Sequence, residues 1–362
     1  MDKKPSIYIQ PLSGIEAWAF ARNEPAYRAK QVLQWLYRKR VTRFQEMSDL
    51  SERLRGELDR DFLLAPLACV RKTGSRDTTQ KFLFVLGDGN FIESVLIPAS
   101  PALYGSPSDR KTICVSTQVG CAYGCKFCAS GLDGWSRNLD AGEIVEQILR
   151  VEALSGEKIN NIVFMGMGEP LANYENVLQA IETIRAPWGI GIGARHITVS
   201  TSGLAPRIRQ LADQPIQIRL AISLHGATDE VRQKIMPVNR KYNLATLIDA
   251  CAYYTERKQQ RITFEYILIE SVNDGLDQAK ELARLAGKLK AKINLIPYNT
   301  VQGLNWHRPS QTRQQVFFRA LERSGVEATI RREKGHDIDA ACGQLRLQKL
   351  RDKNFAGSDN LR

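Results

Sequence analysis

Three cysteines stand close together in the stretch Cys121-Ala-Tyr-Gly-Cys125-Lys-Phe-Cys128, and their thiolates could bind iron or zinc. A structural zinc site usually has four protein ligands, often in two separated pairs, and an electron-transfer iron–sulfur cluster has a fourth cysteine close by. Neither pattern occurs around these residues. Three thiolates can instead bind three irons of a [4Fe–4S] cubane and leave the fourth iron open. Because an open iron can bind the amino and carboxylate groups of S-adenosylmethionine (SAM), the spacing predicts a cluster that cleaves SAM.

Four further cysteines lie apart from this motif, at positions 69, 114, 251 and 342. A lone cysteine is most often a small buried hydrophobe, and we expect this of Cys69 and Cys251. Cys342 lies between alanine and glycine, so its small neighbours would leave the thiol accessible to a bulky group. Cys114 lies on the predicted strand that leads into the three-cysteine motif, which would bring it near the same site.

The composition is that of an ordinary globular protein, with 43% hydrophobic and 25% charged residues. No apolar run approaches the roughly 18 residues of a membrane span, and no signal-peptide pattern follows Met1, so we expect a cytoplasmic protein with no membrane partner. The net charge of +12 comes from several separate basic patches. Such a surplus favours polyanionic partners, because neutralised phosphates release their counterions.

The first hundred residues contain a helical part and then a strand-like part. The pattern is helical from Leu12 to about Asp61. Two strand-like runs follow, Phe82 to Leu86 and Phe91 to Ile97, and the Gly87-Asp88-Gly89 turn between them predicts a β-hairpin.

Strands and helices alternate after residue 110. Strand-like runs lie near 111–116, 160–165, 195–200, 216–223, 261–268 and 292–297, with helical stretches after each. The first helix has a capping box formed by Asp140 and Glu143. Six such units predict an α/β fold with a parallel sheet, a partial (β/α)6 TIM-like barrel rather than a closed eight-stranded one. In such folds the chemistry takes place at the carboxyl ends of the strands.

Several motifs along the chain, taken together with the three cysteines, resemble the RlmN/Cfr family of radical SAM RNA adenine methyltransferases. Arg40 is a departure, since that family often has glycine there. The matching stretches are Tyr27 to Tyr37, Lys111 to Cys121, Arg137 to Leu139, Gly166 to Leu171, Ser200 to Gly203, Ser223 to His225, Pro297 to Asn299 and Asp337 to Leu345.

The resemblance implies a division of the chain and a set of cofactors. It implies an N-terminal helical RNA-binding accessory domain over 1–64, a β-hairpin extension and linker over 65–106, a radical SAM core over 107–335, and a C-terminal segment over 336–362. One [4Fe–4S] cluster would be held by Cys121, Cys125 and Cys128, and two molecules of SAM would be used per turnover. The residues implied to contact SAM are Gly168, Glu169, Ser200, Ser223, Leu224, His225 and Asn299.

The resemblance also gives roles to residues that would otherwise have ordinary structural explanations. Cys342 would carry the methyl group as S-methylcysteine, and Cys114 would resolve a covalent protein–RNA adduct by forming a disulfide with Cys342. Glu93, otherwise a polar residue on an alternating strand, would accept the proton lost from adenine. A methyl group carried on a cysteine and transferred by radical chemistry suits carbon 2 or carbon 8 of adenine. Neither carbon is a nucleophile, so neither can take a methyl group from SAM by ordinary displacement.

The implied partners are an RNA and an electron donor such as flavodoxin or ferredoxin. The family modifies an adenosine in the peptidyl-transferase region of 23S rRNA, and some members also modify tRNA. The stretch from Gln118 to Ala122 is most similar to the RlmN branch, which favours carbon 2. Two alternatives stay open on the sequence: a Cfr-like carbon-8 methylase, and a non-enzymatic RNA-binding protein stabilised by a metal.

Overall fold

The computed structural model describes residues 4–64, 67–99, 108–132, 134–301, 303–331, 334–340 and 344–345. Three α-helices form the N-terminal part, as the sequence predicts: α1 (Leu12–Phe20), α2 (Tyr27–Gln34) and α3 (Glu52–Asp61). Short turns lie between and before them: η1 (Ile7–Ile9), η2 (Trp35–Lys39) and η3 (Phe44–Glu46). The hydroxyl of Ser51 accepts a hydrogen bond from the amide of Leu54 and so caps the start of α3.

A ten-stranded sheet forms the centre of the molecule, in the order β1-β2-β3-β4-β7-β8-β9-β10-β11-β12. Its strands are β1 (Ala68–Gly74), β2 (Gln80–Val85), β3 (Phe91–Pro98), β4 (Lys111–Cys114), β7 (Asn161–Phe164), β8 (Ile197–Thr201), β9 (Arg219–Ser223), β10 (Thr263–Leu268), β11 (Lys292–Pro297) and β12 (Ala328–Ile330). From β4 to β12 neighbouring strands run parallel, and the six predicted strands are all among them. The predicted partial barrel is confirmed.

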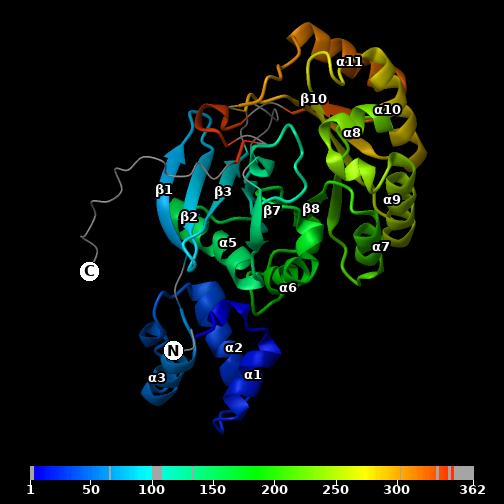
Figure 1. Ribbon diagram of the computed structural model, residues 1–362. Helices are drawn as coiled ribbons and strands as arrows, with labels where there is room; N and C mark the ends of the chain where they lie inside the picture. Colours follow the sequence, from blue (N-terminus) through cyan, green and yellow to red (C-terminus); the bar gives the residue numbers. More distant parts are fainter. Residues whose placement is uncertain are drawn as a thin grey trace.

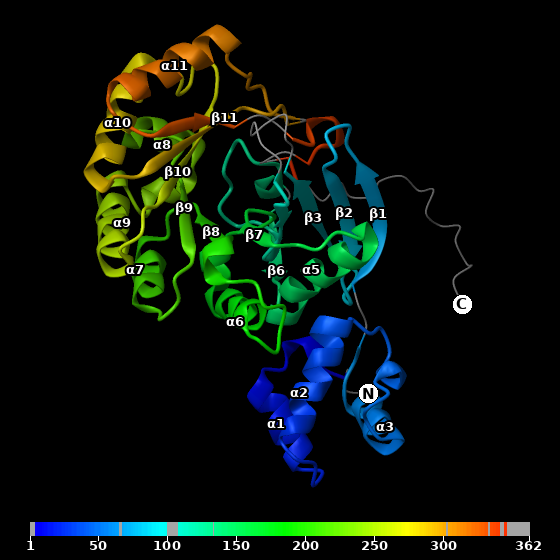
Figure 2. The ribbon, with the colours of Figure 1, turned by 180° about the vertical axis from the view of Figure 1, so that it is seen from behind.

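Helices follow the parallel strands and cover the outer face of the sheet (Figures 1 and 2). The predicted helices are present as α5 (Ala141–Ser155), α6 (Tyr174–Arg185), α7 (Ala205–Asp213), α9 (Leu244–Lys258), α10 (Leu276–Leu289) and α11 (Gln311–Arg323). A further helix, α8 (Asp229–Ile235), was not predicted. Asp140 and Glu143 form the predicted capping box at the start of α5.

The predicted β-hairpin is formed by β2 and β3, and β1 adds a third antiparallel strand. Because β3 also pairs with β4, with Val95 opposite Cys114, these strands continue the barrel sheet instead of forming a separate layer. Figure 2 shows the described C-terminal residues, in red, beside the upper ends of these strands. The hairpin therefore lies next to the carboxyl ends of the parallel strands.

The N-terminal helices pack below α5 and α6, at the end of the barrel away from those carboxyl ends (Figure 1). The side chain of Gln179 on α6 donates to the carbonyl of Ile9, at 2.9 Å. Arg40 has a left-handed backbone with φ of 57°, which explains why glycine suits this position. Its guanidinium pairs with the buried carboxylate of Glu152 on α5, which fixes the two parts together. Among the residues that the structure describes, no helix has the length and apolar composition needed to cross a membrane.

Candidate active site

The three-cysteine motif lies in a loop at the carboxyl end of β4. A two-stranded ribbon, β5 (Gln118–Gly120) and β6 (Trp135–Asn138), closes the base of this loop. The amide of Cys121 donates to the carbonyl of Gly134 at 2.8 Å. A Cβ atom on Gly120, whose φ is 74°, would lie 2.0 Å from that same carbonyl oxygen. Only glycine therefore lets the two sides of the loop close.

Cys121, Cys125 and Cys128 are half-buried thiols that face one cavity. Burial raises the pKa of Cys121 to about 12, and the neighbouring Cys128 and Glu169 add to the rise. Burial likewise raises the pKa of Cys125 well above its ordinary value, with further repulsion from the two other thiols. Three thiolates so close together need a bound cation to be stable, because a coordinated metal removes the proton and offsets the repulsion.

Three thiols that face one cavity can each bind a different iron of a [4Fe–4S] cubane. Within the described part of the chain, no group of three or more histidine, cysteine or acidic side chains is placed to hold a single metal ion. In a cubane each iron takes one thiolate, so the three sulfurs stand at separate corners. Phe127 is buried beside the last cysteine and its ring meets that of His225 edge to face, at 4.6 Å, which shields the loop from water.

A cavity lies in front of these thiols. Its walls come from the carboxyl ends of β7, β8, β9 and β10. Five of the residues predicted to contact SAM line it with the three cysteines: Gly168, Glu169, Ser200, Ser223 and His225.

Gly168 and Glu169 follow β7 and are fixed by contacts with the start of the cysteine loop. The amide of Glu169 donates to Oε1 of Gln118 at 2.8 Å. The carboxylate accepts from the amides of Leu171, at 3.0 Å, and Ser202, at 2.6 Å. Burial nevertheless raises the pKa of Glu169, although these hydrogen bonds lower it. Glu169 thus joins the ends of β7 and β8 at the cavity wall.

Ser200, Ser223 and His225 place polar atoms on the next two strand ends. The hydroxyls of Ser200 and Ser223 lie 3.4 Å apart. His225 has φ of 56°, and its Nδ1 accepts from the amide of Ile267 at 3.0 Å. Burial lowers the pKa of His225 to about 3, and the cation of Arg232 lowers it further, so the ring is neutral at pH 7. Its remaining proton is therefore on Nε2.

Leu224 and Asn299 are not among the residues that line this cavity. Leu224 is buried, and its carbonyl accepts from Nε of Arg232 at 3.2 Å. Asn299 is buried too, and its Oδ1 accepts from Nη2 of Arg308 at 2.9 Å. Their contact with SAM stays a prediction.

A second group of residues lies beside the cavity, around Cys114. Cys114 is buried among Val95, Met167, Ala340 and Leu345. Cys342 itself lies outside the described residues. Ala340 and Leu345 stand on either side of it in the sequence, so residues before and after Cys342 belong to the same buried cluster as Cys114.

Glu93, the predicted proton acceptor, is buried on β3 instead of exposed. Its carboxylate lies 3.2 Å from the ammonium group of Lys81 on β2. The same ammonium donates to the carbonyl of Asp339, also at 3.2 Å. Lys81 therefore links Glu93 to the segment that precedes Cys342.

The hairpin and two loops hold the chain on both sides of Cys342. Ser75 donates to the carboxylate of Asp337 at 2.5 Å. On the other side, the side-chain Nε2 of Gln344 donates to the carbonyl of Thr300 at 3.1 Å. The hydroxyl of Ser130, in the cysteine loop, donates to the carbonyl of Leu345 at 2.6 Å.

Sequence reasoning missed the buried polar residues that position the cysteine loop. Gln147 on α5 accepts from the amide of Ser116 at 2.8 Å and donates to its carbonyl at 3.0 Å. Asn173 donates to the carbonyls of Thr117 and Leu139, at 2.8 and 2.7 Å. Gln147 did leave a signal, because it lies on the apolar stripe of its helix.

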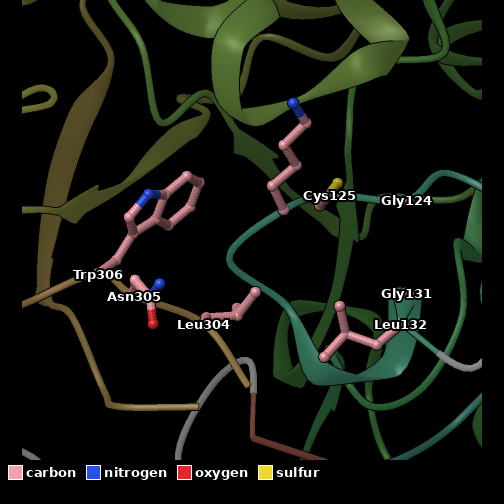
Figure 3. Close-up of a pocket in the computed structure, with 8 residues that line it drawn as sticks. Gly124, Cys125, Gly131, Leu132, Leu304, Asn305 and Trp306 are labelled. Carbon is pink, nitrogen blue, oxygen red and sulfur yellow. The ribbon is translucent and has the colours of Figure 1, made fainter. Parts of the chain in front are cut away.

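A second hollow, with about 520 Å³ of empty volume, meets the cysteine loop from another side. Figure 3 shows Trp306, Asn305 and Leu304 facing Gly131 and Leu132 across it, with Cys125 behind. Cys125 and Gly131 line both hollows, so the loop is approached from two directions.

A partial barrel with three thiols on the loop after its first parallel strand defines a radical SAM enzyme. The Radical SAM superfamily matches residues 115–286, and the ribosomal RNA large subunit methyltransferase N-terminal domain matches residues 11–64. Radical SAM proteins use SAM and a [4Fe–4S] cluster.

Similar proteins cover almost the whole chain. A probable dual-specificity RNA methyltransferase RlmN from Akkermansia muciniphila is 51% identical over 354 residues, 98% of this chain and 99% of that protein. One from Opitutus terrae is 52% identical over 360 residues, 97% of this chain and 96% of that protein. The crystal structure of a radical SAM methyltransferase from Sphaerobacter thermophilus matches with a TM-score of 0.88 and 43% identity, over 94% of this chain and 99% of that one. The chain belongs to the RlmN family of radical SAM methyltransferases.

Proposed function

We propose that this chain methylates carbon 2 of an adenosine in RNA, through a methyl group carried on Cys342. The observation that carries the proposal is that Cys114 lies in one buried cluster with Ala340 and Leu345, which flank Cys342 in the sequence. The names of the relatives, which are RNA methyltransferases, and the net charge of +12 support an RNA substrate. The proposed targets are 23S rRNA, in its peptidyl-transferase region, and tRNA.

The cysteine loop and the cavity would hold the cofactors. Cys121, Cys125 and Cys128 are the proposed ligands of the cluster, and Gly168 and Glu169 belong to the proposed SAM wall with Ser200, Ser223 and His225. When bound, the reduced cluster supplies the one-electron cleavage of SAM. The chain's own contribution is to orient SAM and to exclude water, which the buried Phe127 and His225 favour.

The thiols would carry the carbon and release the product. The sulfur of Cys342 would attack the methyl carbon of one SAM, with S-adenosylhomocysteine as the leaving group. A second SAM would supply the radical, so two SAM molecules would be used per turnover. Glu93 accepts the proton that leaves the adenine ring. The thiolate of Cys114 would then attack the sulfur of Cys342 and form a disulfide. The bond between that sulfur and the carbon attached to adenine would break, and this carbon would take up a proton, which frees the methylated RNA. That disulfide must be reduced before the next turnover.

We place the N-terminal domain at 1–64, the hairpin extension and linker at 65–106, the radical SAM core at 107–335 and the methyl-carrying segment at 336–362. The N-terminal domain would bind RNA, and the exposed Lys30 and Lys39 support this. A protein reductant such as flavodoxin or ferredoxin would reduce the cluster, with an approach through the hollow beside Cys125. Because the RNA targets and reduced thiols belong there, we place the enzyme in the cytoplasm.

The test is mass spectrometry of nucleosides from 23S rRNA fragments and tRNA, after reaction with the anaerobically reconstituted chain. We expect 2-methyladenosine from wild type and from Cys69→Ala, a matched cysteine control on β1. Cys342→Ala should form none while still cleaving SAM. Only 8-methyladenosine would move the assignment to carbon 8, and no methylated adenosine from a cluster-loaded protein would overturn the proposal. A colourless zinc protein would support a non-enzymatic role instead.

A further inference from the structure

Arg232, on α8, is a fully buried guanidinium whose hydrogen-bond partners are neutral. It donates to the carbonyl oxygens of Ser202, at 2.5 Å, and Leu224, at 3.2 Å, and to Oδ1 of Asn239 at 2.8 Å. It forms no ion pair with a carboxylate of the described residues. A buried charge is costly unless an opposite charge lies nearby, so this cation calls for a counter-charge.

The carboxylate of Asp229 is separated from Arg232 by one side chain. Oδ1 of Asn239 accepts from Arg232, and Nδ2 of Asn239 donates to Oδ1 of Asp229 at 2.9 Å. Asp229 also accepts from the amide of Leu244, at 2.8 Å. The side chain next to the guanidinium is therefore the neutral amide of Asn239. A carboxylate at that position would neutralise Arg232 directly.

Arg232 lies directly behind the wall of the proposed cofactor cavity. Ser202 and Met236 line that cavity, and the amide of Met236 donates to the carbonyl of Arg232 at 2.7 Å. The amide of Lys126, next to Cys125, donates to the carbonyl of Ile235 in the last turn of α8, at 2.9 Å. Helix α8 thus joins the cysteine loop to the ends of β8 and β9.

Electrostatics point the same way. Burial lowers the pKa of Arg232 to about 10, and the thiol of Cys125 opposes this fall more strongly than Asp229 does. A bound cluster would place negative charge on the cysteine loop, which helix α8 contacts through the amide of Lys126.

We propose that Arg232 is the built-in counter-charge of the iron–sulfur cluster and raises its reduction potential. Three thiolates and an oxidised [4Fe–4S] core carry one net negative charge, and the reduced core carries two. The added electron comes from an external one-electron reductant, and no proton or ligand is exchanged. A fixed cation stabilises the reduced form more than the oxidised form, because attraction grows with the second charge. The inference rests on the proposed cluster ligands and is independent of the RNA substrate.

The experiment is a dithionite redox titration of the full chain, reconstituted anaerobically with iron and sulfide and followed by electron paramagnetic resonance. Arg232→Gln should lower the equilibrium constant of reduction about tenfold or more, a shift of about −59 mV per tenfold for one electron. Arg232→Lys keeps the charge and should stay close to wild type. Lys234→Gln removes an exposed charge from the same helix, which solvent screens, and should leave the potential unchanged.

A second variant tests the idea without removing the buried cation. The double variant D229N/N239D exchanges the amide and the carboxylate, keeps the total charge, and moves the carboxylate next to Arg232. Like Arg232→Gln, the double variant should lower the reduction potential of the cluster. An unchanged potential in both variants, or an equal fall in Arg232→Gln and Arg232→Lys, overturns the proposal. A wild-type chain that binds no cluster would instead overturn the ligand assignment on which it rests.

Discussion

Replacing Gly168 by alanine should destabilise the cavity wall by an amount that follows from its geometry. Gly168 has φ of 98°, which a residue with a Cβ atom adopts at a cost of roughly 1–2 kcal/mol. The added Cβ would lie 2.5 Å from Cβ of Gln118 and 2.8 Å from its backbone nitrogen. Such overpacking costs about 1–3 kcal/mol, because the backbone atom cannot swing away. We therefore expect a total loss of about 2–5 kcal/mol.

The loss should also reach the cofactor site. Gln118 accepts from the amide of Glu169, so moving Gln118 disturbs the residue that joins β7 to β8. The assay is urea unfolding of the cluster-free chain, followed by cluster loading of the same variant. Gly287→Ala is the control: Gly287 lies inside α10 with no atom within 4 Å of the added Cβ, and should gain roughly 0.5–1 kcal/mol. If Gly168→Ala loses less than about 1 kcal/mol, the steric reasoning is wrong.

Four further predictions concern single contacts. Burial raises the pKa of Glu146 well above its ordinary value, so its contribution to stability is present below pH about 4.5 and is lost as the pH rises through the folded-state pKa. Glu146→Gln should therefore raise the melting temperature at pH 8 and leave it unchanged at pH 4, and a gain of equal size at both values would contradict this. Gln147→Leu leaves the amide and carbonyl of Ser116 unpaired, and should lower the free energy of unfolding by roughly 2–4 kcal/mol in urea titrations. Lys81→Gln removes the cation that links Glu93 to the carbonyl of Asp339, and should slow RNA methylation roughly tenfold or more. SAM cleavage should stay unchanged in that variant, and Lys81→Arg should keep most of the activity. Cys114→Ala should accumulate a covalent protein–RNA adduct on denaturing gels, whereas Cys251→Ala, on α9, should not.

Most of the barrel was predictable because its signals are local. Apolar runs and helix caps depend on neighbours a few residues away, and the capping box of Asp140 and Glu143 is present as expected. The position of the site was predictable too, since parallel strands bring their carboxyl ends to one edge. One predicted contact differs: Ser223 and His225 line the cavity, while Leu224 between them is buried in the core and does not.

The contacts that hold the site together were not predictable, because they join residues far apart in the sequence. Lys81 and Asp339 meet across 258 positions, and nothing periodic marks either one. The sequence patterns singled out neither Arg232 nor the helix α8 on which it lies. Its burial depends on where Ser202 and Asn239 stand in the fold, which no local pattern encodes.

These contacts change how the β-hairpin is understood. As an extension of the sheet, it would only cover an edge that is otherwise open to pairing. Yet Ser75 binds Asp337, and Lys81 binds both Glu93 and Asp339, so the hairpin holds the chain that leads to Cys342. The proposed base and the proposed methyl carrier would therefore be positioned by the same lysine. The proposed reaction needs a proton acceptor and a carbon carrier beside the same adenine ring. Lys81, on a strand of the hairpin, links the residues proposed for these two roles.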